Sequence, residues 1–494
     1  MIKYLLFLTL FFSIERFAQL IKTPLEINNY EKITLYQDLT EFIYYLEGLS
    51  DVLTVEVIGK SVDGRNIYAL KYSNSEFGKD ESKIKVLIFA QQHGNEQSGK
   101  EGALLLASRL IRSDLKDVLN KVDLILIPQM NPDGSETNQR RNGNGADLNR
   151  NHLILTEPET IALHKLFNEY KFEVTMDVHE YFPYSESWNE FGYIKSADEQ
   201  FGLTTNLNVS DQIRNYSKER VLPFIGSYLN ERGFSFNEYV VGGPPNLDRL
   251  RHSTVDIDDG RQSFGIQNTL SFILEGKNGK EYAVENIKHR SEGQAAAMLG
   301  LLGFVHDNAD EIKSLIKTER ERLINFSKTV VLRMEHTENS ETISLPVTIA
   351  SNDKDTIIDV SNYHPTVENL FEVSLPDAYI VPGSDSLLLK LIERHSIYFE
   401  ETLPEILNIE QYIITGIDTI ELENIKLADV QVRVNQKTIN DLDGKYVLIP
   451  TNQSKKNTIT LAFEPQSMLG LIHYNMYKYL IENNEYPILR VFRD

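Results

Sequence analysis

The chain has 494 residues and a formal net charge of −22 at pH 7, with 41% hydrophobic and 10% aromatic residues. This composition is typical of a globular protein, and the length predicts two or more domains. The negative charge argues against nucleic-acid binding, which requires clustered Lys and Arg, and the absence of cysteine excludes disulfides and cysteine–zinc sites.

The first residues have the features of a secretory signal peptide. Lys3 provides a positive start, Tyr4–Ile14 form an apolar stretch too short to span a bilayer, and Ala18 is a small residue before a cleavage point. We expect residues 1–18 to be removed, the protein to be secreted or periplasmic, and no stable membrane insertion. An uncleaved anchor is the alternative.

Strand and helix patterns alternate from Lys22 to about residue 330, which predicts an α/β fold with a mixed sheet flanked by helices. Such sheets bind ligands at strand ends. A capping box at Thr156-Glu-Pro-Glu159 predicts a helix to about Tyr170. The other predicted helices are Leu35–Leu49, Gly102–Ile111, Ser291–Val305 and Ala309–Phe326. The predicted strands are Val55–Ser61, Asn66–Tyr72, Ile84–Ala90, Val122–Pro128, Phe172–Val178 and Thr269–Leu274.

The sequence pattern changes to short β-rich runs after a polar linker at Glu335–Glu341. We expect a catalytic domain over residues 22–330 and a β-rich α+β accessory domain of unknown role over residues 342–494. Its predicted strands are Ile343–Ala350, Thr356–Ser361, Ile397–Glu400, Tyr412–Thr415, Val430–Val434, Tyr446–Ile449 and Thr458–Phe463. Its predicted helices are Asp385–His395 and Met468–Glu482.

His93 and Glu96, with two residues between them, stand where a buried strand passes into a helix. An imidazole and a carboxylate at this spacing can bind one divalent metal, and a catalytic zinc site needs three protein ligands and an open position. We expect His179, at the end of the strand before Glu180, to be the third ligand of one zinc ion per chain. His152 is the rival. Taken alone, the pair also fits a turn histidine beside a surface carboxylate.

A cationic segment lies between these residues, in Arg140-Arg-Asn-Gly-Asn-Gly-Ala-Asp-Leu-Asn-Arg-Asn151. Guanidinium groups are the natural partners of carboxylates and developing oxyanions. A metal beside such groups suggests cleavage of an acyl bond next to a free carboxylate. Glu275 ends a later apolar strand, and it is either a solvated end cap or a general base whose pKa is raised by partial burial.

In motif order, the chain resembles the zinc carboxypeptidases of the carboxypeptidase A type. The resemblance runs from about Lys22 to the Asp307 region and comprises HxxE, Asn131-Pro-Asp-Gly134, R…DLNRN, a third His and a late Glu. It implies zinc-dependent hydrolysis of the C-terminal peptide bond of peptides or proteins.

The resemblance also implies a role for each matching residue. Glu275 would be the general base that takes a proton from the attacking water and passes it to the leaving amine. Arg140 would polarise the scissile carbonyl, with the adjacent Arg141 as the alternative register and a further substrate-binding residue. Asn149 and Arg150 would bind the terminal carboxylate of the substrate, and Asp147 would hold the ring of His93. Apart from the resemblance, Asp177 is a weaker candidate to hold His179, because side chains two residues apart share a face only if the strand continues.

The chain departs from the family in one segment. Arg251–Gln262 contains no match for the family's mobile-loop Tyr, so that role is either absent or taken by another residue. The substitutes are Tyr239, His252 and Arg261. Carboxylates in the same segment hint at substrates with a basic C-terminal residue; they are Asp256, Asp258 and Asp259.

Four functions fit the sequence. The first is a zinc exopeptidase acting on C-termini, and the second is an amidase or endopeptidase on cell-wall peptides that uses the same metal core. The third is a non-enzymatic binding relative, against which the intact ligand set and Glu275 argue. The fourth is a deacylase of small N-acyl amino acids, whose chains usually lack a signal segment and a large appended domain. The sequence does not indicate the oligomeric state.

Overall fold

The computed structural model describes residues 21–112, 116–403 and 408–492. The predicted signal peptide lies outside these residues. In the part of the chain that is described, no helix combines the length and the apolar character needed to cross a membrane.

An eight-stranded mixed sheet forms the centre of the first part of the chain, in the order β1-β2-β4-β3-β5-β11-β7-β8. The inner strands β4, β3, β5 and β11 are mutually parallel, whereas β2 and β7 join them antiparallel. The predicted mixed sheet is confirmed. Its strands are β1 (Leu53–Lys60), β2 (Asn66–Tyr72), β3 (Ile84–Ala90), β4 (Val122–Ile127), β5 (Val174–Tyr181), β7 (Glu199–Gly202), β8 (Phe236–Glu238) and β11 (Leu270–Lys277).

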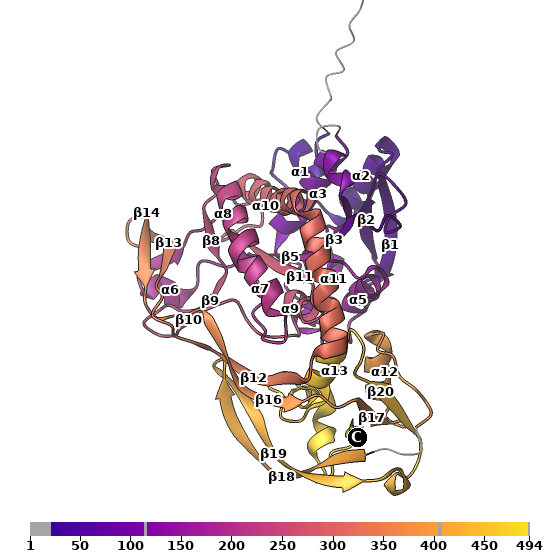
Figure 1. Ribbon diagram of the computed structural model, residues 1–494. Coiled ribbons are helices and arrows are strands. Elements are labelled where there is room, and N and C mark those ends of the chain that lie inside the picture. The colour runs from indigo at the N-terminus through magenta and orange to yellow at the C-terminus, as the bar shows by residue number, and fades with distance from the viewer. Residues whose placement is uncertain (1–20, 113–115, 404–407, 493–494) are drawn as a thin grey trace, which may run out of the picture.

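Helices cover both faces of this sheet (Figure 1). Because side chains alternate between faces along a strand, Val86 and Ile88 of β3 join the core of α2, α3, α10 and α11, and Leu87 and Phe89 join that of α5 and α9. The helices are α1 (Pro24–Ile27), α2 (Tyr36–Leu49), α3 (Gln97–Leu110), α4 (Pro132–Glu136), α5 (Pro158–Tyr170), α6 (Glu186–Glu190), α7 (Asp211–Tyr216), α8 (Leu222–Asn230), α9 (Gly260–Gly265), α10 (Ile287–Asp307) and α11 (Ala309–Phe326).

The C-terminal region contains a five-stranded antiparallel sheet in the order β19-β18-β21-β17-β20 and a separate pair, β12 and β16. This β-rich α+β character agrees with the predicted fold class. Its elements are β12 (Thr329–Thr337), β16 (Thr366–Ser374), β17 (Ala378–Pro382), α12 (Ser386–Arg394), β18 (Asn408–Leu422), β19 (Ile425–Lys437), β20 (Tyr446–Pro450), α13 (Lys456–Phe463), the 3-10 helices η5 (Leu471–His473) and η6 (Asn475–Ile481), and β21 (Leu489–Phe492).

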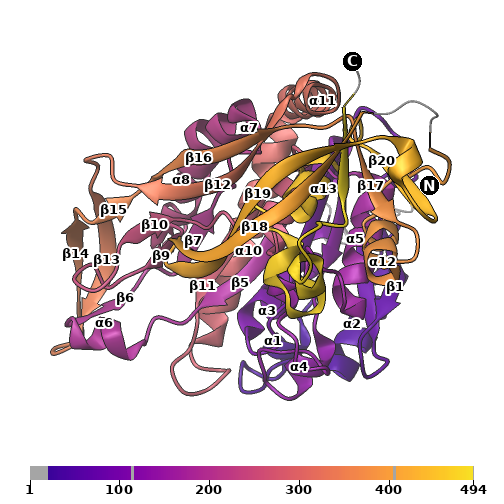
Figure 2. The same cartoon turned by 90° about the horizontal axis from the view of Figure 1, so that it is seen from below.

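Two small sheets join the first part of the chain to the C-terminal region. The hairpin β13 (Ile343–Ile349) and β14 (Lys354–Val360) adds to β6 (Tyr193–Lys195). Strand β15 (Tyr363–His364) pairs with β10 (Leu250–His252), which also pairs with β9 (Val240–Gly242). Figure 2 shows the long β18–β19 hairpin reaching from the C-terminal sheet to β9 and β10. The two parts therefore share hydrogen-bonded sheets.

Several predicted elements are wrong. Thr458–Phe463, predicted as a strand, belongs to helix α13, and Met468–Glu482 contains two short 3-10 helices in place of one α-helix. Ile397–Glu400 makes only an isolated bridge, between Glu400 and Leu448. The predicted linker begins inside β12. Helix α5 starts at Pro158 without a side-chain cap, so the capping box is absent. All eight residues of α13 are buried, so the apolar–polar periodicity that marks a helix is missing.

Candidate active site

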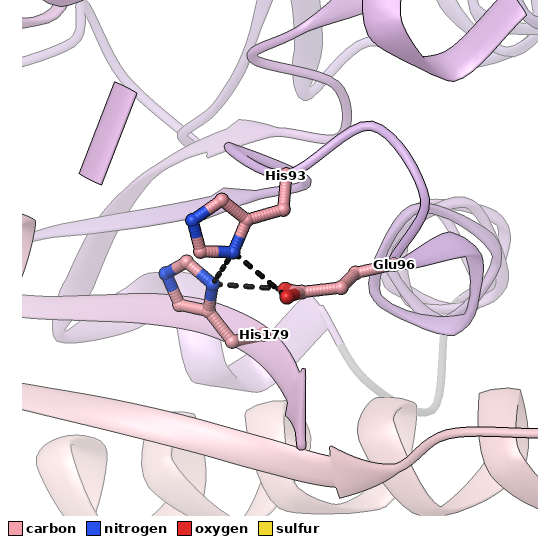
Figure 3. Close-up of side chains that lie close together, drawn as sticks. All are labelled: His93, Glu96 and His179. Atoms are coloured by element: carbon pink, nitrogen blue, oxygen red, sulfur yellow. Dashed lines mark hydrogen bonds and ion pairs between the residues drawn. The ribbon is translucent and has the colours of Figure 1, made fainter. Parts of the chain in front are cut away.

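Three side chains that can bind metal converge at the ends of β3 and β5. His93 and Glu96 lie on the turn between β3 and α3, and His179 lies on β5 (Figure 3). One potential ligand atom from each lies within 4.8 Å of the others. The two Nδ1 atoms are 3.1 Å apart, and Glu96 Oε1 lies 2.7 Å from His93 Nδ1 while its Oε2 lies 2.9 Å from His179 Nδ1. All three residues are buried.

The opposite ring nitrogens of the two histidines are held by aspartates. His93 Nε2 lies 3.1 Å from Asp147 Oδ1, and His179 Nε2 lies 2.8 Å from Asp177 Oδ1. An Nε2–H that donates to a carboxylate leaves the Nδ1 lone pair free for a metal. Asp177 and His179 share a face because β5 continues to Tyr181. This donor set fits zinc, whose tetrahedral bonds of about 2.0–2.1 Å place ligand atoms about 3.3 Å apart.

Glu275 lies beside this cluster because of the strand register. On β11 it pairs with His179 of β5 in parallel register, so the two side chains leave the same face of the sheet. Burial raises the pKa of Glu275 to about 7, with His179 opposing this shift and Glu96 adding to it. A carboxyl group with a pKa near neutrality suits general base catalysis.

Arg140 faces the same cluster from the loop after α4. Its Nε and Nη2 donate to Asp147 Oδ2 at 3.0 and 2.9 Å, and its Nη1 lies 3.2 Å from His93 Nδ1 and 3.7 Å from Glu96 Oε1. Burial opposes ionisation of Asp147, but its contacts with His93 and Arg140 hold its pKa well below the usual range. Asp147 therefore orients both a metal-capable ring and a half-exposed guanidinium.

The remaining predicted substrate residues differ in placement. Asn149 is buried, with its Oδ1 accepting from the backbone N–H of Gly260 at 2.8 Å and its Nδ2 lying 3.4 Å from His179 Nε2. Arg150 is exposed and donates to the Asn149 carbonyl at 2.6 Å. Arg141 is also exposed and donates to the Gly145 carbonyl at 3.1 Å. Asn149 is thus beside the cluster, whereas Arg141 contacts its own loop.

His152, the rival ligand, belongs to another group. Its Nδ1 lies 3.0 Å from His164 Nε2, and its Nε2 lies 2.8 Å from the Gln92 amide oxygen. Gln92 in turn donates to Asp177 Oδ2 at 2.8 Å. Through Gln92 and Asp177, the side chain of His152 is therefore connected to the metal-capable cluster indirectly.

Among the three substitutes for the missing loop Tyr, Tyr239 lies close enough to Glu275 for the two groups to interact electrostatically. His252 pairs with Glu238 and Arg261 with Asp259. Burial raises the pKa of Tyr239, and the charge of Glu275 adds to this shift. Lys195, which the sequence did not single out, lies over the Tyr181 ring at 5.2 Å. Burial lowers its pKa to about 8 against the opposing charge of Glu275. A single lysine on a short edge strand carries no sequence signal.

Comparison with known proteins agrees with this geometry. Residues 39–220 match the family described as zinc carboxypeptidase. Carboxypeptidase 2 of Trichophyton rubrum is 25% identical over 447 residues, covering 87% of this chain and 81% of that protein. Carboxypeptidase D of Mus musculus is 31% identical over 297 residues, or 51% of this chain and 20% of that protein.

Among solved structures, a metallo-carboxypeptidase from Pseudomonas aeruginosa is similar over 56% of this chain and 69% of its own, with 22% identity and a TM-score of 0.43. The family match covers the segment that carries His93, Glu96 and His179. Over this segment the chain is similar to the zinc carboxypeptidases, and the match supports a metallopeptidase whose cofactor is a zinc ion.

Proposed function

We propose that this protein is a zinc-dependent metallocarboxypeptidase that releases the last residue of peptides or proteins, with His93, Glu96 and His179 as the metal ligands. The observation that carries the proposal is the register of β5 and β11, which sets Glu275 beside a ligand cluster whose far nitrogens are fixed by aspartates. The general base Glu275, the three metal ligands and the oriented guanidinium of Arg140 then lie around the same position.

The chemistry divides among these residues. When bound, a zinc ion supplies a Lewis acid and lowers the pKa of a water molecule at its open position. Glu275 accepts a proton from the attacking water and delivers it to the leaving amine. Arg140 donates hydrogen bonds to the carbonyl oxygen as negative charge develops on it. Asp147 holds the guanidinium of Arg140 in place.

The residues that follow Asp147 orient the substrate. In this proposal Asn149 and Arg150 bind the free α-carboxylate, with Arg141 as a further substrate-binding cation. Carboxylates surround Arg150, and although burial opposes its charge, Asp258 and Asp256 raise its pKa. The guanidinium is therefore always charged, as recognition of an anionic chain end requires.

The proposal includes a division of the chain into a signal peptide and two domains. Residues 22–330 form the catalytic domain, residues 342–494 the accessory domain, and residues 1–18 a signal peptide that directs the protein to the periplasm or outside the cell. The fungal relatives bear the name Carboxypeptidase 2, which supports the activity.

One peptide in two forms tests the direction of cleavage. We expect the zinc-loaded protein to remove the last residue from the form with a free C-terminus, to cut the amidated form poorly, and to ignore N-terminal blocking. A chelator should abolish the reaction. Mass spectrometry of both digests decides the matter. Internal cuts, or equal cleavage of both forms, would replace this proposal with an endopeptidase or cell-wall amidase.

A further inference from the structure

The C-terminal region holds the segment around β10 by polar contacts. The turn of the β18–β19 hairpin supplies Glu423, whose Oε2 accepts from Arg251 Nη1 at 2.7 Å. His336 of β12 lies 3.0 Å from the same carboxylate oxygen through Nδ1 and 3.0 Å from the His252 carbonyl through Nε2. Arg251, His252, His336 and Glu423 are all half-buried or buried. These contacts therefore connect the segment around β10 directly to the C-terminal region.

A cavity of about 720 Å³ opens next to this segment, between the two parts of the chain. The catalytic side contributes Asp256, Ile257 and Asp258. The opposite wall comes from the C-terminal region, from the start of β19 and from the residues around η5 and η6. Neither part of the chain encloses the cavity alone.

Asp258 is the residue at which the two walls meet. Its Oδ2 accepts a hydrogen bond from the Tyr474 hydroxyl at 3.2 Å. Its Oδ1 is shielded from solvent and has no hydrogen-bond partner among the described residues. A shielded acceptor without a donor is costly, so this oxygen is suited to bind a donor that arrives with a ligand.

A chain of hydrogen bonds connects this cavity with the metal-capable cluster. The backbone carbonyl of Asp258 accepts from the His152 N–H at 3.1 Å. Through its ring, His152 contacts Gln92, which donates to Asp177, the partner of His179. The cavity wall is therefore three side chains away from a proposed zinc ligand.

The charge around Asp258 favours a cationic ligand. Burial and, after it, the charge of Asp256 raise the pKa of Asp258 to about 7, with Arg150 and the Tyr474 hydroxyl acting against this shift. The charged or titratable groups that face it are Asp256, Asp259, Arg150 and Tyr474, together with Lys426, His473, Lys478 and Glu482 across the cavity. The phenol stabilises the carboxylate without neutralising it, so attraction for a cation is retained.

We propose that Tyr474 is a specificity-determining residue, and that the C-terminal region thereby forms one wall of the pocket that receives the side chain of the substrate's last residue. The proposal rests on the carboxypeptidase function proposed above. In the complex, Tyr474 binds Asp258 Oδ2 and keeps the carboxylate ionised, while Oδ1 accepts a hydrogen bond from the ammonium or guanidinium of a C-terminal Lys or Arg.

Two peptides that differ only in a C-terminal lysine or norleucine provide the test, because their side chains differ by the ammonium group. The ratio of their kcat/KM values would be measured on the full-length, zinc-loaded protein between pH 6 and 9. Tyr474→Phe removes only the hydroxyl. We expect the ratio at neutral pH to fall by about three- to tenfold, with recovery near pH 9, where Asp258 ionises without help.

Two further variants give the two limits of this result, full loss of the preference and no change. Asp258→Asn should bring the ratio to about one at every pH. Tyr477→Phe is the matched control, because Tyr477 is buried in η6 and does not line the cavity. It should leave the ratio and its pH midpoint unchanged. Thermal unfolding of each variant separates a folding defect from an effect on binding.

The outcomes separate this inference from the function on which it rests. If Tyr474→Phe lowers kcat/KM equally for both peptides, or keeps the wild-type ratio and midpoint, Tyr474 does not determine specificity. A wild type that releases norleucine as readily as lysine at every pH would also overturn the inference while leaving carboxypeptidase activity intact. If neither peptide loses its last residue, the proposed function itself fails.

Discussion

Two groups of buried histidines in this protein have opposite electrostatic surroundings. His93 and His179 each contact carboxylates; burial lowers the pKa of His179, but Asp177 and Glu96 outweigh this and raise it. His152 and His395 contact no carboxylate among the described residues, and burial lowers their pKa values to about 4 and about 3. The same side chain therefore becomes a ligand suited to a cation in one place and a neutral packing group in the other.

The largest expected effect is the loss of metal from the first group only. His93→Ala, Glu96→Ala and His179→Ala should each reduce zinc from about one ion per chain to a small fraction, because three ligands are needed for tight binding. His152→Gln should retain full zinc as the control from the second group. Metal analysis after dialysis measures both. Stoichiometric zinc in all three alanine variants would remove the distinction between the groups.

The next effect concerns Glu275, which lies in the field of the first group. Glu275→Gln keeps the shape of the side chain but cannot accept a proton, so zinc and substrate should still bind while kcat falls on the order of 10²–10⁴-fold. Wild-type kcat/KM should also fall at acid pH with an apparent pKa at or below about 7, since protonated Glu275 is inactive and a bound cation favours the carboxylate. Near-normal turnover of the variant would assign the proton transfer to another residue.

A smaller effect concerns Arg150, a cation surrounded by carboxylates that we propose binds the terminal carboxylate of the substrate. Arg150 is exposed, so each charge-assisted bond to substrate is worth about 1.5 kcal/mol, the lower end of the usual range, or roughly tenfold. Arg150→Ala should reduce the preference for a free over an amidated C-terminus by at least that factor, and Arg150→Lys by less. Equal loss on both peptide forms would mean that Arg150 does not bind the carboxylate.

The smallest effect concerns stability, and it probes the second group. Because the folded-state pKa values of His152 and His395 lie below the unfolded value near 6.5, the unfolded chain binds more protons below that pH. Each should therefore cost about 2 kcal/mol of unfolding free energy at pH 5 relative to pH 8. Denaturant unfolding of chelated protein measures this, and His395→Gln should flatten the pH dependence. An unchanged slope would show that His395 has the same pKa in the folded and the unfolded states.

Much of the site follows from local sequence. His93 and Glu96 lie on one turn with two residues between them, and His179 is carried by a strand whose apolar run is visible in the sequence, so the structure brings together the three residues that the motifs indicated. The pairing of Asp177 with His179 depended on the strand continuing to Tyr181, which it does. These features depend on side-chain period and strand ends, both of which are readable from sequence.

The C-terminal region was less predictable because its contacts are long-range. Tyr474 and Asp258 are 216 residues apart in sequence, and no periodicity indicates such a pair. Helix α13 was predicted as a strand because Thr458, Ile459 and Thr460 are β-branched residues that favour strands, whereas burial on all sides decided the outcome. Tertiary packing outweighed local preference there.

The pairing of His179 with Glu275 has a consequence for how this chemistry can change. A shift of β11 by one residue against β5 would turn Glu275 to the opposite face of the sheet. Deletion of a residue from β11 ahead of Glu275 would have the same result, although every catalytic side chain would still be present. Because backbone hydrogen bonds allow only whole-residue shifts, β11 can change its alignment with β5 only in steps of one residue. Neither natural variation nor protein engineering can move Glu275 by a smaller step through the register.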